Sequence, residues 1–112
     1  MIERIVIEYL NNTLGIPTYA EKPNKNPNQY IVIKNIGSGR TDCIDAVTLS
    51  IMSYAQTLDN ALNLNEQVQN AMYDIVALDN VSKCKLGGGG QSIDTQSKTY
   101  AYESIFNIFY MK

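Results

Sequence analysis

The residues that could carry out chemistry are few in this chain of 112 residues. It contains no histidine, which removes the commonest general base, the usual partner of a serine or cysteine nucleophile and the commonest metal ligand. Without histidine, its two cysteines, Cys43 and Cys84, do not make a typical closed zinc site. We interpret them as reduced structural thiols in a reducing compartment. Both fall in or beside predicted strands, so they could be neighbours.

The carboxylates and glycines give no sharper signal. Eleven aspartates and glutamates are scattered along the chain, without a pair at a spacing that demands acid–base catalysis. Asp42 and Asp45 flank a predicted turn, where such side chains are solvated or cap the turn. The Gly37-Ser38-Gly39 stretch lacks the Gly-Lys-Ser/Thr ending of a phosphate-binding loop and joins two strands. We therefore expect no catalytic, cofactor-binding or metal-binding residues, and a protein that is not an enzyme.

Length and charge exclude several classes of partner. A chain of this length forms one domain, residues 1–112, with a core of useful size. A net charge of -2 and a pI near 4.9 argue against a general nucleic-acid-binding protein, which needs a basic face for phosphates. No apolar run approaches the roughly 20 residues of a membrane span, and the N-terminal residues lack the features of a signal peptide. We expect synthesis in the cytoplasm and neither a nucleic-acid nor a membrane partner.

The chain is organised around a predicted strand followed by a predicted helix. In the strand, Asp45 to Tyr54, apolar and polar residues alternate. The helix, Leu58 to Leu78, has Thr57 as its N-cap and one apolar side at helical spacing, made by Leu58, Ala61, Leu62, Val68, Met72, Ile75 and Val76. The helix contains several asparagines, which are poor helix formers, so packing of this apolar side on the sheet must stabilise it.

The other predicted elements complete an α+β fold. They are a helix at Ile2–Leu14 ended by Gly15 and Pro17, a short extended piece at Thr18–Glu21, a loop at Lys22–Asn28, a strand at Gln29–Ile36, a turn at Gly37–Asp42, a strand at Val81–Leu86, a polar connection at Gly87–Lys98 and a strand at Thr99–Tyr110. We expect a mostly antiparallel sheet of four to five strands with two helices packed on it.

The last predicted strand carries an aromatic face. That face consists of Tyr100, Tyr102, Phe106, Ile108 and Tyr110, which alternate with the residues of the opposite face. It either lies under a helix or meets another subunit. We assign Phe106 and Ile108 to the core, whereas the tyrosines suit either a half-buried core position or an interface.

This order of elements resembles the tail-completion or tail-terminator proteins of long-tailed phages. The resemblance spans nearly the whole chain and is carried by Pro17–Pro23, Tyr30–Ile33, Asp45–Tyr54, Thr57–Ala61 and Tyr100–Ile105. Tyr54 matches an aromatic residue that the family usually has near the end of the central strand. The four consecutive glycines at positions 87–90 are less typical of the family.

The resemblance implies a structural protein of a phage virion. Members of the family form a ring, commonly of six subunits, which caps the tail tube, ends its polymerisation and joins the tail to the head. The implied partners are other copies of the chain, the tail-tube protein and head connector proteins. The implied location is the head-proximal end of the tail, after synthesis in the cytoplasm of a host bacterium. A ring requires heterologous contacts between neighbouring subunits.

Two other functions fit the same pattern of elements. One is a different virion part, either a head–tail connector component or a tail-tube protein. The other is a non-enzymatic binding module with a ferredoxin-like sheet.

Two polar segments, Lys22 to Asn28 and Gly87 to Lys98, are candidates for assembly. They are rich in proline or glycine and lack the periodicity of a helix or strand, so they could order against a partner or serve only as solvent loops. We also expect the purified protein to be monomeric or weakly associated, and to close into a ring only on the tail end. The candidate interface residues are Lys22, Asn24, Lys25, Gly87, Gly88, Gly89, Gly90, Asp94, Tyr100 and Tyr102.

Overall fold

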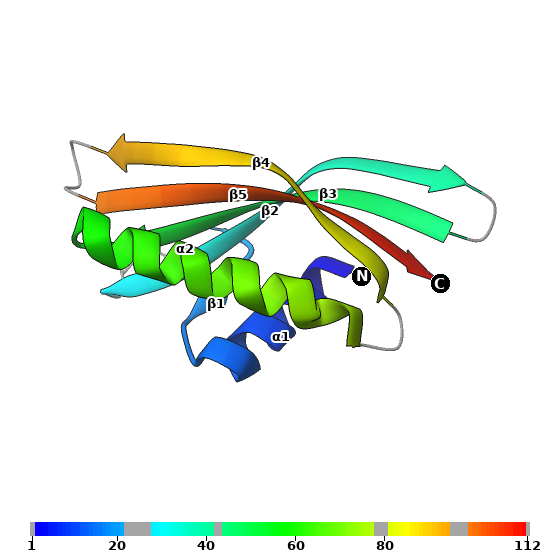
Figure 1. The fold of residues 1–112 in the computed structure, drawn as a ribbon, viewed down its shortest axis with the longest axis horizontal. Coiled ribbons are helices and arrows are strands. Elements are labelled where there is room, and N and C mark those ends of the chain that lie inside the picture. The colour runs from blue at the N-terminus through cyan, green and yellow to red at the C-terminus, as the bar shows by residue number, and fades with distance from the viewer. Residues whose placement is uncertain (1, 22–27, 42–43, 78–80, 95–98, 112) are drawn as a thin grey trace.

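The computed structural model describes residues 2–21, 28–41, 44–77, 81–94 and 99–111. Helices α1 and α2 lie on one side of a five-stranded sheet (Figure 1), so the predicted α+β fold with two helices on a mostly antiparallel sheet is confirmed. The elements are α1 Ile2–Leu14, β1 Thr18–Tyr19, β2 Gln29–Thr41, β3 Ile44–Ala55, α2 Leu58–Tyr73, the 3-10 helix η1 Asp74–Ala77, β4 Val81–Asp94 and β5 Thr99–Met111.

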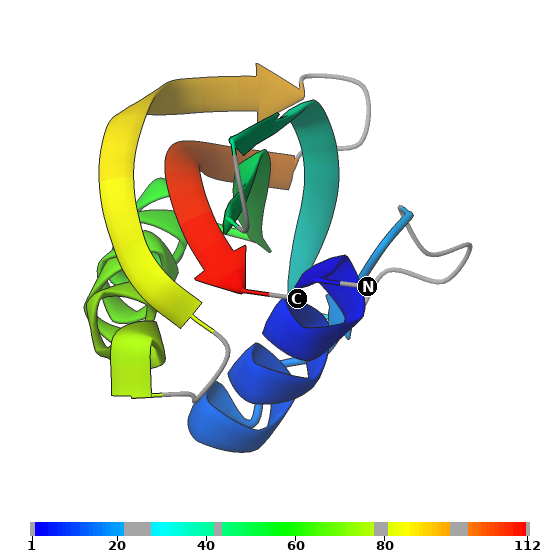
Figure 2. The same cartoon turned by 90° about the vertical axis from the view of Figure 1, so that its right-hand side faces the viewer.

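The strands lie in the order β1-β2-β3-β5-β4. Only β1 and β2 are parallel, and the other neighbouring pairs are antiparallel. The last strand, β5, therefore lies between β3 and β4 and makes β4 an edge strand. Figure 2 views the molecule end-on and shows how strongly the long strands bend above the two helices.

Alternation along the central strands places one face of the sheet against the helices. Leu49 of β3 and Phe106 of β5 are ladder partners, and both are fully buried. Val6 of α1 and Val68 of α2 pack in the same core. The prediction that Phe106 and Ile108 belong to the core is confirmed.

The second helix begins and ends differently in detail from the prediction. The Thr57 side chain accepts a hydrogen bond from the backbone N–H of Asn60 at 3.2 Å, which confirms the predicted N-cap. The α-helix ends at Tyr73 and tightens into η1. Leu58 and Leu62 are exposed, contrary to the prediction. They fall at the border of the buried stripe, which consists of Ala61, Leu64, Asn65, Val68, Ala71, Met72 and Ile75.

The predicted turn at Gly37–Asp42 is wrong for the residues that the structure describes. β2 continues through Gly39 to Thr41, with a register shift between Asn35 and Gly37. Asp45 lies inside β3 and is buried, so the expectation of a solvated turn residue is also wrong. Pairing with β3 supplies the hydrogen bonds that keep the glycine-containing segment extended, which local propensity alone does not. Asp42 and Cys43 lie outside the described residues.

The predicted polar connection at Gly87–Lys98 is wrong over most of its length. Gly87 to Gly90 belong to β4, where Gly88 pairs with Ile105 and Gly90 pairs with Glu103. Asp94 is the last residue of β4 and pairs with Thr99. Because β5 pairs with β4 on both sides of the register shift between Leu86 and Gly88, the glycines stay in the strand although they weaken it intrinsically.

Candidate assembly interface

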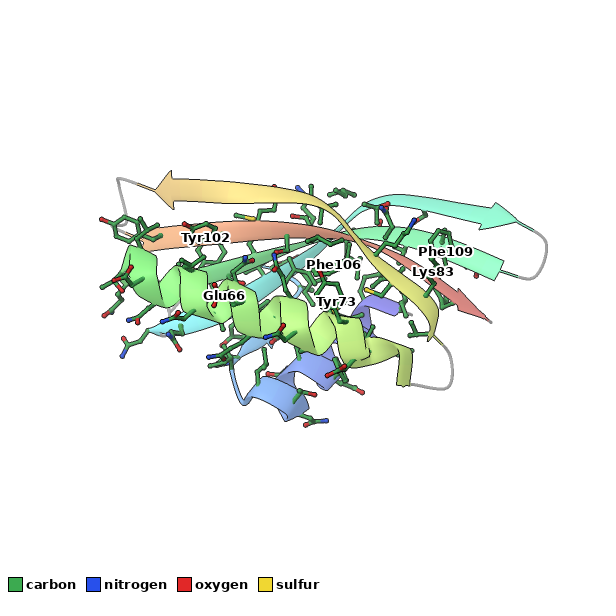
Figure 3. All side chains as sticks on the ribbon, in the orientation of Figure 1. Glu66, Tyr73, Lys83, Tyr102, Phe106 and Phe109 are labelled. Atoms are coloured by element: carbon green, nitrogen blue, oxygen red, sulfur yellow. The ribbon has the colours of Figure 1, made fainter. Side chains whose placement is uncertain are left out.

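The predicted interface residues divide into two groups. Lys22, Asn24 and Lys25 lie in the segment 22–27, outside the described residues. The four glycines, Asp94 and the two tyrosines are spread along the β4–β5 hairpin: the glycines lie in the middle of β4, Asp94 lies at its end, Tyr102 pairs with Gln91 and Tyr100 pairs with Ile93. Tyr100 and Tyr102 are half-buried on the helix-facing side of β5, and Figure 3 shows Tyr102 nearer the hairpin end than Phe106.

The four glycines lie on the edge strand, and an added Cβ would meet a close neighbour at only two of them. A Cβ on Gly89, which has a φ of 157°, would overlap the carbonyl oxygen of Glu103. A Cβ on Gly87 would lie 2.8 Å from the side-chain nitrogen of Asn107. Gly88 and Gly90 have no such neighbour within 4 Å. Glycines 87 and 89 therefore let β4 approach β5 closely, whereas the other two positions could hold a side chain.

The outer edge of β4 is open to a partner. Residues 85–90 are all exposed, as is Lys83, and within the described part of the chain no strand pairs with this edge. An edge of this length presents a row of unpaired backbone N–H and C=O groups. Leu86 adds a large apolar side chain that is 40% exposed.

A second open edge, which the sequence did not single out, runs along β2. The short strand β1 pairs only with Ile31 and Val32. Beyond them, residues 34–39 are exposed except for half-buried Gly37, and the Ile36 side chain is 49% exposed. A strand pattern continued through Gly37 would have been the signal for this edge, but the two glycines indicated a turn.

The aromatic residue that the sequence matched to the family helps to hold this side of the sheet. Tyr54 of β3 stacks on Tyr30 of β2 with ring centroids 4.7 Å apart and planes 8° from parallel. Tyr19 of β1 meets Tyr30 edge-on at 6.4 Å. The three rings therefore link β1, β2 and β3 where the outer edge of β2 is covered.

Polar contacts tie the central strands together on the face away from the helices. The Thr48 hydroxyl donates to the side-chain oxygen of Asn107 at 2.8 Å, and the Ser50 hydroxyl donates to the Glu103 carboxylate. Both bonds join β3 to β5. Side-chain hydrogen bonds therefore strengthen the pairing of β3 with β5, the two strands that lie between the open edges of β2 and β4.

A buried polar network holds α2 on the other face. The Ser104 hydroxyl donates to the side-chain oxygen of Asn65 at 2.6 Å and accepts from Nε2 of Gln69 at 3.1 Å. Ser104 and Asn65 are both buried. The network satisfies polar groups that would otherwise be costly inside the core.

Two side chains, Cys84 near the start of β4 and Tyr9 of α1, have raised pKa values. Burial raises the pKa of the Cys84 thiol to about 11, so this free, half-buried thiol is protonated at neutral pH. Burial and the nearby Asp74 carboxylate raise the pKa of Tyr9. The Tyr9 hydroxyl donates to the backbone carbonyl of Ala71 at 2.6 Å and so links α1 to α2.

The described residues form no grouping with an evident chemical role. They include no cluster of three or more cysteine, aspartate or glutamate side chains that could hold a metal ion. A polar hollow of about 460 Å³ is lined by residues without ionisable side chains: Ile16, Pro17, Asn28, Gln29, Gln56 and Asn60. Neither described helix is long and apolar enough to cross a membrane.

Comparison with known proteins identifies a shared fold. No protein-family model and no curated protein matches the chain. A solved structure described as "Virion of native gene transfer agent (GTA) particle" contains a chain with a TM-score of 0.67 and 11% sequence identity. The match covers 96% of this chain and 92% of that chain. The protein therefore has, over nearly its whole length, the fold of a chain found in that virion.

Proposed function

We propose that this chain is a structural protein of a phage virion, which forms a ring that caps the tail tube, ends tail polymerisation and joins the tail to the head. The observation that carries the proposal is the fold match, with a TM-score of 0.67, to a chain of a virion particle. The resemblance of the sequence to tail-terminator proteins supports the finer assignment to the head-proximal end of the tail.

The proposed mechanism is recognition without chemical turnover. A closed ring is built from heterologous contacts, in which one surface of a subunit meets a different surface of the next. The two open edges are different surfaces, because β2 and β4 lie toward opposite edges of the same sheet. They support ring formation because each can bind an additional strand.

The proposed partners are other copies of the chain, the tail-tube protein and the head connector proteins. The ring commonly has six subunits in the family that the sequence resembles. One end of the ring would cover the last ring of the tail tube and the other would present a docking surface to the head. No cofactor takes part in this proposal.

Deletion of the gene from a particle-producing genome tests the function directly. Electron microscopy should show overlong tails or tails unattached to heads, and a plasmid copy of the gene should restore normal particles. Tailless, leaking heads would instead indicate a connector component, and loss of tail tubes would indicate the tube protein. Particles of normal shape and yield would refute a structural role in the virion.

A further inference from the structure

The two open edges lie at the same level of the sheet. The ladder partners run in one row from Asn35 of β2 through Leu49 of β3 and Phe106 of β5 to Leu86 of β4. Ile36 follows Asn35 directly, at the register shift. The rows of ladder partners that begin in the exposed stretch of β2 therefore cross β3 and β5 and end in the exposed stretch of β4.

Each edge carries one large apolar side chain at this level. Ile36 is 49% exposed and Leu86 is 40% exposed, and they are two of five large hydrophobic residues found exposed among those whose side-chain burial is described. Neither has a covering element of its own within that part. A contact that brought the two edges together would bury both side chains at once.

The strand directions also suit such a contact. From β2 to β4 the strands alternate in direction, so β2 and β4 run in opposite directions. A second copy in the same orientation would place its β4 antiparallel to β2 of the first. That is the pairing geometry of every other long strand in the sheet.

We propose that β4 of one copy pairs with the outer edge of β2 of the next copy, residues 34–39, and that Leu86 packs on Ile36 across this junction. This inference rests on the proposed ring and names the contact that builds it. The pairing is heterologous, because a different edge of each copy takes part. Its repetition closes a ring when a whole number of copies completes one full rotation. The sheet then continues from subunit to subunit.

Lysines on both edges explain why this pairing is conditional. Lys34 lies on the β2 edge, and Lys83 and Lys85 lie on the β4 edge; all three are exposed. Lysines on an edge strand disfavour pairing with another strand, because their charges repel and must be desolvated. The edges therefore stay apart in dilute protein and pair at high local concentration, as on the end of a tail.

Cross-linking of engineered cysteines tests the pairing in the isolated full-length chain. Two variants, Ile36→Cys and Leu86→Cys, are prepared with both native cysteines replaced by serine. Adjacent strands lie only about 4.8 Å apart, so a short bismaleimide reaches across the junction. At roughly millimolar protein, we expect a dimer in the mixture of the two variants, at least tenfold above the yield of either variant alone.

The other outcomes overturn the proposal. A strong dimer from Leu86→Cys alone would mean that two β4 edges pair with each other, and one from Ile36→Cys alone would mean the same for β2. No dimer in any sample would refute pairing between copies through these edges. The gene-deletion phenotype does not depend on this result, so a failed contact and a failed function are distinguished.

Lysine substitutions give a second readout with a matched control. Sedimentation of the unchanged chain should show a mass that increases with concentration, and Leu86→Lys should abolish this increase without changing the denaturation midpoint of dilute protein. Leu62→Lys is the control, because Leu62 is 38% exposed and lies on α2, which belongs to neither edge strand. Equal loss of association in both variants would overturn the proposal, as would normal association of Leu86→Lys.

Discussion

The most direct test of the fold compares the same substitution at two buried serines on the helix-facing side of the sheet. Ser104 of β5 and Ser53 of β3 are both completely buried. The Ser104 hydroxyl joins Asn65 and Gln69 of α2. The Ser53 hydroxyl has no hydrogen-bond partner among the described residues. Replacement by alanine removes the same atom from two opposite environments.

The expected changes in the free energy of unfolding differ in sign. Ser104→Ala removes two hydrogen bonds and leaves the buried Asn65 oxygen without this donor, which should cost about 2 kcal/mol or somewhat more. Ser53→Ala removes an unpaired polar group from the core and should be neutral or stabilising by up to about 1 kcal/mol.

Urea denaturation of dilute protein measures both changes. With a slope of about 1–3 kcal/mol per molar urea, the midpoint of Ser104→Ala should fall by roughly 1 M, whereas that of Ser53→Ala should stay or rise. An unchanged slope would show that the denatured state is comparable. Equal destabilisation by the two substitutions would refute the assignment of the polar network.

Three further predictions use the same measurement. Gly89→Ala should destabilise the protein by more than about 1 kcal/mol because its Cβ would overlap Glu103, whereas Gly88→Ala should stabilise it by roughly 0.4–1 kcal/mol; equal effects would contradict the assigned glycine roles. Tyr9→Phe should cost about 1 kcal/mol through loss of its bond to α2, and no change would contradict that contact. Burial raises the Cys84 pKa from 9.0 to about 11, so the stability it contributes is complete below pH 9 and is lost as the pH rises through 11. Between pH 9 and pH 11, the denaturation midpoint of Cys84→Ser should therefore fall less than that of the unchanged protein. Parallel pH profiles of the two proteins would contradict the raised pKa.

Much of the fold could be predicted because local and long-range signals agree. The alternation in β3 and the cap at Thr57 gave elements whose type and core side the structure confirms. The glycine-rich segments could not be placed in the same way, because a glycine has no side chain to show alternation and indicates a turn by default. Only the partners across the ladder, such as Ile105 for Gly88, keep these segments in strands.

The candidate interface was harder to predict than the core. Which strand lies at an edge depends on the insertion of β5 between β3 and β4, which the order of strands along the chain does not reveal. In the sequence, the glycines of β4 have the composition of a loop, whereas in the structure they form part of an open edge strand. The sequence does not predict the β2 edge, because Gly37 and Gly39 indicate a turn where the structure has a strand.

The central place of β5 has a consequence for biosynthesis. While the ribosome is still translating residues 99–111, β3 has no partner on one of its sides and Phe106, a large member of the core, is absent. The sheet can close only after this strand has emerged, since β4 has no other neighbour in the described fold. The nascent chain therefore cannot present the β4 edge in its final place before synthesis of β5 is complete. The topology therefore delays the pairing between copies proposed above until β5 has been made, and the slow step of folding should be the docking of this late strand.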